Sequence, residues 1–472
     1  MSKTKATDSV GNREHEETPS ENGPQAAASG QALRDTLDRM QKGDLSVAIL
    51  GLGYVGIPLA EAYVRSGVRV LGVDVNQSRV DMLNNGTSGM RHIDDERIQR
   101  MVDSGKFRAT TDASALSDYD ALIIAVPTPL DRYHHPDLSY VVATCDTIKT
   151  VLRPGQLVVL ESTTYPGTTQ EIMRPILEES GLKVGDDFAL AYSPEREDPG
   201  NIDFETSTIP KLVGADSALE RDLAKAVYEK VVTTVMVPNT RTAEAAKLTE
   251  NIFRWVNIGL VNELKLVYDK MGIDVWDVIK AADSKPFGFM AFYPGPGVGG
   301  HCIRIDPYYL TWKAREHGVS TRFIELAGEV NIAMPNHVVS RLMEELNLRH
   351  GKALSGARIL LCGVAYKKNI DDVRESPSLE ILSLLERHGA KVDIYDPYVP
   401  IVPRTHDYPE FEGRKSIEWN SEILGEFDAA LIATDHKFVD YAMLVNEVPL
   451  VVDTRNVTKD LPEELLKKVS KA

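Results

Sequence analysis

Cysteine is scarce in this sequence, with three residues in 472, and tryptophan is nearly as rare at four. Cys145, Cys302 and Cys362 are too few for a disulfide framework, and their spacing matches no zinc motif. We therefore expect free thiols, a reducing compartment and no metal site. Cys145 and Cys362 lie in apolar, regularly patterned stretches and are expected in the core, whereas Cys302 needs a separate explanation.

Long apolar runs are also missing. No stretch reaches the roughly 18 consecutive apolar residues of a membrane span, and the first 20 residues lack the apolar segment of a secretory signal peptide. We expect a cytoplasmic protein with no membrane partner. Basic residues are outnumbered, 53 Lys and Arg against 70 Asp and Glu, for a formal net charge of -17. This balance disfavours nucleic-acid binding but is compatible with a local basic pocket for an anionic small molecule.

The N-terminal 30 residues contain almost no large apolar side chain and are rich in Ser, Glu, Asn, Gly and Ala. Such a composition cannot bury enough surface to order itself, so residues 1–44 are predicted to form a disordered tail. Within them, residues 31–43 have the apolar spacing of a short helix.

Strand and helix patterns alternate along the rest of the chain, which predicts doubly wound parallel sheets. Between two such regions, residues 243–271 combine helix formers with apolar spacing of three and four, and predict a long central helix. The expected fold class is α/β, with two Rossmann-like doubly wound parallel-sheet domains joined by a long central helix in a helical dimerisation domain. The expected domains are 45–220, 221–350 and 351–472, and the expected strands lie at 47–50, 68–73, 121–126, 157–161, 188–192, 358–363, 391–395, 427–433 and 450–453.

Residues 51–56, GLGYVG, form a glycine fingerprint that follows a strand and opens a helix. Gly51 permits the tight turn, Gly53 lets the backbone approach a pyrophosphate, and Gly56 lets helix and sheet pack closely. Asp74, at the end of the next strand, favours NAD over NADP because it binds ribose hydroxyls and repels a 2′-phosphate. Arg79, five residues further on, is the competing signal, because a nearby arginine can accommodate the 2′-phosphate of NADP. The predicted cofactor-binding residues here are Gly51, Gly53, Tyr54, Val55, Gly56, Asp74 and Arg79.

Three glycines, Gly297, Gly299 and Gly300, precede Cys302. They are costly in a regular element, and make sense if a ligand or another backbone must approach the thiol closely. A thiol beside His301, near a helix N-terminus, would have a depressed pKa and act as a nucleophile. On this segment alone, a flexible glycine loop with an incidental cysteine is an equally good interpretation.

The segment GVGGHCIRID at 297–306 resembles the active-site loop of the UDP-glucose/GDP-mannose dehydrogenase family. The resemblance extends from about Leu45 to Val457. It implies that residues 45–220 bind NAD, that 221–350 carry the catalytic cysteine, and that 351–472 bind the UDP-sugar. Further matching stretches, in the same order, are VPTP at 126–129, ESTTYPG at 161–167, SPER at 193–196, AKLTEN at 246–251 and YKKNIDDVRES at 366–376.

Members of this family oxidise the C6 alcohol of a nucleotide-linked sugar to a carboxylate with two NAD, through a thiohemiacetal and a thioester on the cysteine. The resemblance places the nucleophile at Cys302. A lysine can stabilise the oxyanion, and acidic side chains can position water or transfer protons. The implied catalytic residues are Cys302, Lys247, Asn251, Asp306, Thr164 and Glu195. The resemblance adds Thr128 and Arg374 on the cofactor side, and Arg196, Gly299 and Lys367 on the substrate side, with Arg241, Phe287 and Tyr293 as weaker substrate candidates.

The cysteine loop, with PDLSY at 136–140 and FYPGPG at 292–297, resembles the branch of the family that acts on UDP-N-acetylhexosamines. It predicts UDP-N-acetylglucosamine as substrate, with UDP-N-acetylmannosamine, UDP-N-acetylgalactosamine and UDP-glucose as alternatives. Arg304 departs from the pattern, because this branch commonly has proline there. A cation two residues from the thiol would either lower its pKa further or point to solvent.

Two other interpretations compete. A one-hydride dehydrogenase of the hydroxyacid type would leave the cysteine loop and the second α/β domain unexplained. A catalytically degenerate nucleotide-sugar-binding protein would not preserve Cys302, Lys247, Asn251 and Asp306 together. The long central helix also predicts a homodimer or a higher even-numbered homo-oligomer.

Overall fold

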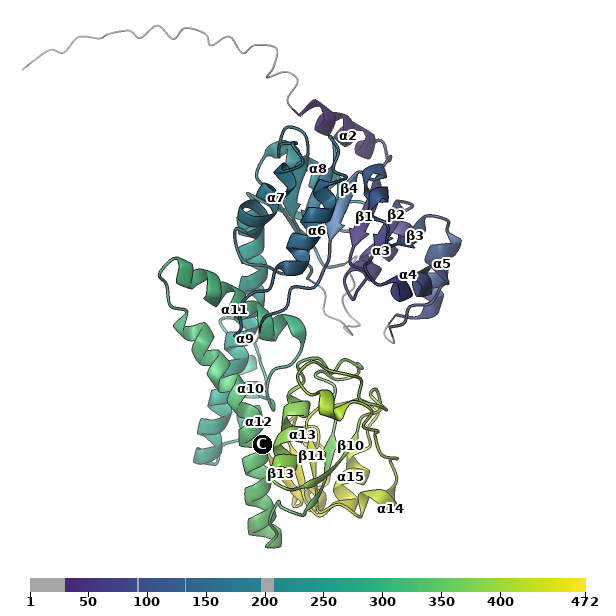
Figure 1. The fold of residues 1–472 in the computed structure, drawn as a ribbon. Helices are drawn as coiled ribbons and strands as arrows, with labels where there is room; N and C mark the ends of the chain where they lie inside the picture. Colours follow the sequence, from purple (N-terminus) through teal and green to yellow (C-terminus); the bar gives the residue numbers. More distant parts are fainter. Residues whose placement is uncertain (1–29, 91–92, 132, 197–207) are drawn as a thin grey trace, which may run out of the picture.

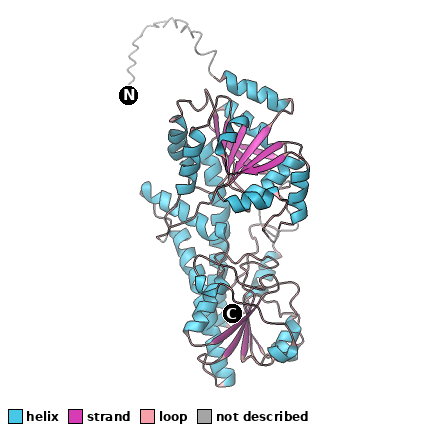
Figure 2. Ribbon diagram, turned by 45° about the vertical axis from the view of Figure 1, so that its right-hand side comes forward, coloured by secondary structure: helices cyan, strands magenta, loops and turns pink. Residues whose placement is uncertain are grey.

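The computed structural model describes residues 30–472 except 91–92, 132 and 197–207, and leaves the side chains of His301 and Cys302 undescribed. Residues 1–29 of the expected disordered tail lie outside the described residues. Two α/β domains sit at opposite ends of a column of long helices (Figure 1). The two sheets are separate, with helices between them, as the view in Figure 2 shows.

The first sheet has eight strands in the order β3-β2-β1-β4-β5-β6-β7-β8. Its pairs are parallel except β6 with β7, so the expected doubly wound parallel sheet is confirmed with one antiparallel step. Every residue of β1, β4, β5 and β6 is buried, as expected for strands covered on both faces. The strands are β1 Ser46–Leu50, β2 Arg69–Val73, β3 Phe107–Thr110, β4 Ala121–Ile124, β5 Leu157–Leu160, β6 Ala189–Tyr192, β7 Lys211–Ala215 and β8 Thr234–Val237.

The helices of this domain begin before the expected boundary. The helix expected over 31–43 is α2, and its Leu33 and Met40 are fully buried in the core of the first domain. This part of the expected tail was therefore wrong, because an amphipathic helix lies there and packs against α8. The boundary at residue 220 falls inside α8, so the domain extends to β8. The helices are α2 Gln31–Gln41, α3 Gly56–Arg65, α4 Gln77–Asn84, α5 Asp95–Asp103, α6 Ser139–Lys149, α7 Arg174–Glu178 and α8 Ala218–Tyr228, with short turns η1 Ala113–Asp118 and η2 Thr169–Met173.

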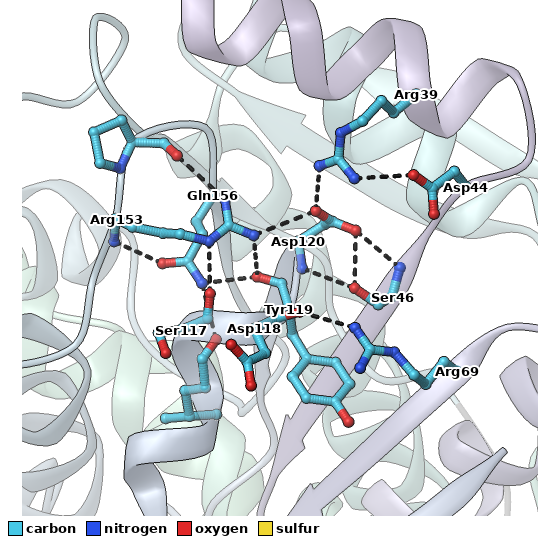
Figure 3. Close-up of polar contacts among 12 residues, drawn as sticks. Arg39, Asp44, Ser46, Arg69, Ser117, Asp118, Tyr119, Asp120, Arg153 and Gln156 are labelled. Atoms are coloured by element: carbon cyan, nitrogen blue, oxygen red, sulfur yellow. Dashed lines mark hydrogen bonds and ion pairs between the residues drawn. The ribbon is translucent and has the colours of Figure 1, made fainter. Parts of the chain in front are cut away.

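A buried carboxylate anchors α2 to the sheet (Figure 3). Asp120, just before β4, accepts hydrogen bonds from Arg39 of α2 at 2.5 Å and from the Ser46 hydroxyl at 2.8 Å. Arg153 approaches the same carboxylate at 3.4 Å. Burial opposes ionisation of Asp120, but the hydrogen bonds from Arg39 and Ser46 outweigh it and lower its pKa. This network lies at the starts of β1 and β4, away from the strand ends that carry the glycine fingerprint.

The helix expected over 243–271 is confirmed as α9, which begins three residues earlier because Asn239 caps it through the Thr242 N–H. Helices α9 and α12 run side by side along the column (Figure 1). Trp255 of α9 is buried against α12 and donates to the Ile324 carbonyl at 3.1 Å. The central helices are α9 Thr240–Met271, α10 Val275–Asp283, α11 His301–Glu316 and α12 Arg322–His350.

The second sheet has five strands, all paired in parallel, in the order β10-β9-β11-β12-β13. Cys362 on β9 is buried, and so is Cys145 in the first domain, as expected. Burial raises the pKa of Cys145 to about 12, so this thiol is inert at neutral pH. Among the described residues, no helix is both long and apolar enough to span a membrane. The elements are β9 Arg358–Cys362, α13 Pro377–Arg387, β10 Lys391–Tyr395, η3 Pro409–Phe411, α14 Ser421–Leu424, β11 Ala429–Ile432, α15 Tyr441–Glu447, β12 Val451–Asp453, α16 Glu463–Leu466 and β13 Val469–Lys471.

Candidate active site

The glycine loop after β1 has the geometry that a dinucleotide needs. Gly51 has a φ of 99°, and a Cβ there would lie 2.5 Å from the Ala125 carbonyl oxygen. A Cβ on Gly56 would lie 1.9 Å from the Gly51 carbonyl oxygen. Around Gly53, by contrast, an added Cβ would have no described atom within 4 Å apart from Gly53 itself and its two neighbours in the chain. The loop is thus packed tightly where it turns and open where a pyrophosphate would approach, at the N-terminus of α3.

Asp74 follows β2 and lies half-buried beside the loop. Its carboxylate accepts the Leu52 and Asn76 N–H groups, each at 2.9 Å, which leaves lone pairs for ribose hydroxyls. Arg79 donates to the Leu52 carbonyl at 3.1 Å and so binds the loop itself. The predicted residues of the glycine loop, with Asp74 and Arg79, therefore lie together at the carboxyl ends of β1 and β2, and this arrangement fits NAD.

Four of the predicted catalytic residues form one buried group. Lys247 and Asn251 lie one turn apart on α9, and Lys247 donates to the Glu195 carbonyl at 2.6 Å, with its carboxylate 3.4 Å away. Asn251 donates to Asp306 of α11 at 2.5 Å. The group joins the loop after β6, the central helix and the helix that begins at the cysteine loop. Thr164, which directly precedes Tyr165, is buried, and its hydroxyl donates to the Thr168 hydroxyl.

Asp306 is the most perturbed acid of this group. Burial raises its pKa to about 6, although the Lys247 charge and the Asn251 hydrogen bond both favour the ionised form. The side chain is 1% exposed. A carboxylate with a pKa close to neutrality can accept and return a proton under working conditions. Asp306 therefore suits a general base better than a permanent ion.

Helix α11 begins at His301, so Cys302 occupies its first turn and Asp306 lies one turn further on. The helix is held against the first domain by a small apolar cluster in which Tyr165 and Tyr309 meet Leu248 of α9. The Tyr309 hydroxyl donates to the Thr128 carbonyl at 3.0 Å, so Thr128 holds this helix through its backbone.

A cavity of about 360 Å³ lies beside this group, between the central helices and the second α/β domain. Its described lining includes Tyr293, which stacks on Trp276 at 5.3 Å, and the glycines 297, 299 and 300. Glu250 is the one acidic residue among the described lining residues. Basic side chains predominate: Arg196, Lys247, Arg254, Lys367, Arg374 and Arg455.

Residues 372–377, which we call the bridging segment, connect the cavity to the cofactor loop. The Arg374 guanidinium is held by Asp372 and lies 4.2 Å from the ring centre of Tyr54 in the glycine loop. The Arg374 carbonyl accepts the Gly300 N–H at 3.3 Å. This segment of the second α/β domain thereby touches both the cofactor loop and the cysteine loop.

Three predicted residues do not behave as expected. Arg241 pairs with Glu171 at 3.0 Å, and Phe287 is 71% exposed; neither belongs to the described lining of the cavity. Arg304 points neither to solvent nor into the cavity of 360 Å³. It pairs with Glu375 of the bridging segment at 3.4 Å, because α11 packs against the second domain at this turn.

Two of the basic residues that line the cavity were not predicted. Arg254 lies two turns beyond Lys247 on α9, and a search for same-face cations on the helix would have found it. Arg455 follows β12, at the strand end where ligands bind in open α/β sheets. It donates to the Ala433 carbonyl at 2.8 Å, and burial lowers its pKa.

A dinucleotide-binding loop that Arg374 connects to a cation-lined cavity is typical of a nicotinamide-dependent dehydrogenase that acts on an anionic substrate. Known proteins agree. Models of the UDP-glucose/GDP-mannose dehydrogenase family match the chain over the NAD binding domain at residues 45–232, the central domain at 241–333 and the UDP binding domain at 360–460. The chain therefore belongs to the UDP-glucose/GDP-mannose dehydrogenase family and is an NAD-dependent enzyme.

Individual relatives cover nearly the whole chain. UDP-N-acetyl-D-glucosamine 6-dehydrogenase of Pseudomonas aeruginosa is 37% identical over 396 residues, which are 83% of this chain and 91% of that protein. NDP-N-acetyl-D-galactosaminuronic acid dehydrogenase of Ralstonia nicotianae is 35% identical over 431 residues, 87% and 96% of the two chains. The solved structure of UDP-D-ManNAc dehydrogenase from Pyrococcus horikoshii has a TM-score of 0.80 at 33% identity, covering 90% of this chain and 99% of that one.

The different surroundings of two glycines predict different effects of the same substitution. Gly53→Ala should weaken NAD binding by at least about tenfold without changing stability, because its Cβ enters the space that the pyrophosphate needs. Gly56→Ala should lower the free energy of unfolding by about 1–3 kcal/mol, because its Cβ meets backbone. NAD titration calorimetry and thermal denaturation of both apo variants check this pair. Equal affinity of Gly53→Ala and the natural chain would contradict the assignment.

Proposed function

We propose that this enzyme oxidises the C6 alcohol of UDP-N-acetylglucosamine to the carboxylate in two steps, at Cys302. The observation that carries the proposal is the cation-lined cavity, which ends at the buried group of Lys247, Asn251 and Asp306. Guanidinium groups bind phosphate oxygens in a forked geometry, so Arg455 and its neighbours suit a diphosphate. Lys247 and Asn251 line the same cavity as Arg455, which supports a sugar bound beside them.

When bound at the glycine loop, NAD would accept one hydride in each of the two oxidations, and the first oxidation also releases the hydroxyl proton of the alcohol to solvent. After the first, the Cys302 thiolate adds to the aldehyde carbon, and the oxyanion of the thiohemiacetal develops beside Lys247. Loss of the second hydride leaves a thioester. Water attacks it while Asp306 takes a proton, and the Cys302 thiolate departs. The balance is one alcohol, one water and two NAD giving one carboxylate, two NADH and three protons.

The choice of sugar rests on the cysteine loop and on the relatives. Proteins named for N-acetylglucosamine, N-acetylgalactosamine and N-acetylmannosamine derivatives are 33–37% identical to this chain. The sugars in these names share an acetamido group, which favours an N-acetylhexosamine over glucose as the substrate. Resemblance around the cysteine ranks UDP-N-acetylglucosamine first among these substrates. The product would then be a nucleotide-linked uronic acid, of the kind that is used in polysaccharide assembly.

The assembly that we propose is a homodimer formed through α9. Phe253, Leu260 and Val267 are spaced by seven residues, and each is 47–51% exposed, with Met271 continuing the row. We call these four residues the α9 stripe. Apolar side chains at this spacing share one helix side, and an exposed row of them on a long helix indicates a contact surface.

Counting NADH tests the reaction. The purified protein with NAD should form two NADH per UDP-N-acetylglucosamine consumed, whereas UDP-N-acetylmannosamine, UDP-N-acetylgalactosamine, UDP-glucose and GDP-mannose should react more slowly. Cys302→Ser should form no acid, because it lacks the thiolate; Cys145→Ser, a buried position, is the control. Two NADH with UDP-glucose alone would overturn the sugar, and one NADH per sugar would overturn the two-step reaction.

The pKa of Asp306 sets a pH dependence. Because the base must be ionised, kcat should fall as the pH drops through about 6, where Asp306 becomes protonated. Asp306→Asn should lower kcat by roughly 10²–10⁴-fold and remove this acid limb. Glu316→Gln, on the exposed end of the same helix, is the control and should keep the limb. An unchanged limb in Asp306→Asn would assign it to another group.

Light scattering tests the dimer. The natural chain, of 52.2 kDa, should elute at twice this mass, and Leu260→Asp with Val267→Asp should give monomers. The matched control is Phe438→Asp, which changes an apolar residue that is 76% exposed on the second α/β domain. A monomeric natural chain, or a dimer that survives both changes, would contradict an interface at the α9 stripe.

A further inference from the structure

The first turn of α11 is fixed to the second α/β domain at two points, four residues apart. The Gly300 N–H donates to the Arg374 carbonyl at 3.3 Å, and Arg304 pairs with Glu375 at 3.4 Å. Cys302 lies between them in sequence. One turn further, Tyr309 fixes the same helix to the first domain through the Thr128 carbonyl. The position of the nucleophile turn therefore depends on contacts with both α/β domains.

The Arg304 charge is compensated by carboxylates of the second domain. Its side chain is 28% exposed and contacts Glu375, and Glu380 of α13 lines the same small void beside it. The void has a volume of about 10 Å³, which is no more than one water requires, so it is a packing gap and not a ligand site. Burial raises the pKa of both glutamates, while Arg304 opposes the rise.

Glu375 is itself held in an unusual conformation. Its φ is 52°, a left-handed value that costs energy for a residue with a side chain. The carbonyl of Glu375 lies against Gly299, where an added Cβ would meet it at 2.9 Å. Asp407 is the acidic neighbour that further raises the pKa of Glu375. The surrounding contacts thus fix Glu375 between Arg304 and the cysteine loop.

We propose that Arg304 and Glu375 form a positioning pair, which sets the placement of the turn that carries Cys302 relative to the substrate cavity. The inference rests on the proposed role of Cys302. Arg304 acts through its partner in the second domain and does not act as a charge on the thiolate. A proline at position 304 would lack this connection, so the pair is a feature of this chain's own sequence.

Four variants test the pair: Arg304→Gln, Glu375→Gln, the double variant and Arg304→Lys. The measured quantities are kcat and KM for UDP-N-acetylglucosamine, NAD affinity, and the pH dependence of Cys302 alkylation by iodoacetamide, followed by mass spectrometry of its peptide. The matched control is Arg315→Gln, which breaks a similar pair with Glu325, at 3.2 Å, near the far end of α11. Thermal denaturation shows that each variant is folded.

The positioning pair predicts that Arg304→Gln and Glu375→Gln each lower kcat by roughly tenfold or more, since small misplacements of reacting groups are costly. NAD affinity and the thiol pKa should be unchanged. The double variant should be no worse than either single variant, because both remove one interaction. Arg304→Lys should recover most of kcat, and Arg315→Gln should match the natural chain.

The direction of the change in thiol pKa distinguishes the positioning pair from a direct effect of the Arg304 charge on the thiolate. If Arg304 acted as a charge on the thiolate, Arg304→Gln would raise the thiol pKa, whereas Glu375→Gln would free the guanidinium and lower it. Either shift, or an unchanged kcat in Glu375→Gln, would overturn the positioning pair. If the natural chain oxidised no nucleotide sugar, the proposed function would fail. The alkylation of Cys302 would still test the pair, which predicts that the maximal rate at high pH changes equally in both single variants while the thiol pKa stays unchanged.

Discussion

The bridging segment, residues 372–377, is the contact on which the assembled site depends. Arg374 lies over Tyr54 of the cofactor loop, its carbonyl holds Gly300, and Glu375 holds Arg304. All three domains thus meet at this one short stretch of chain. The two sheets lie at opposite ends of the molecule (Figure 1), and the bridging segment contacts both the cofactor loop and the cysteine loop.

The chemistry follows from what this convergence buries. Asp306 is enclosed by α9, α11 and the loop after β6, and loss of water raises its pKa to about 6. Lys247 lies beside it and contacts the Glu195 carbonyl and carboxylate. On the open side, the basic side chains give a strongly acidic protein a positive cavity. The net charge of the chain and the charge of the cavity lining therefore have opposite signs.

Local spacing predicts the geometry of one part of the site, whereas the roles of Lys247, Asp306 and Glu195 come only from the family resemblance. The glycine loop, Asp74 and the Lys247–Asn251 pair lie on single elements or consecutive ones, so their geometry follows from helix and strand periods. The partner of Arg304 and the buried position of Arg455 depend on how distant segments pack, and no local pattern gives that. Helix α2 shows the same limit: its apolar spacing was visible, but its burial against α8 required the tertiary structure.

Trapping an acyl intermediate would show whether Cys302 forms the covalent bond and whether Asp306 assists its hydrolysis. Asp306→Asn mixed with NAD and UDP-N-acetylglucosamine would be examined by intact-protein and peptide mass spectrometry. We expect the Cys302 peptide to carry the added mass of the UDP-linked acyl group. If NADH forms and Cys302 remains unmodified while the product is still bound to the enzyme, the assignment of the acyl intermediate to Cys302 would be contradicted.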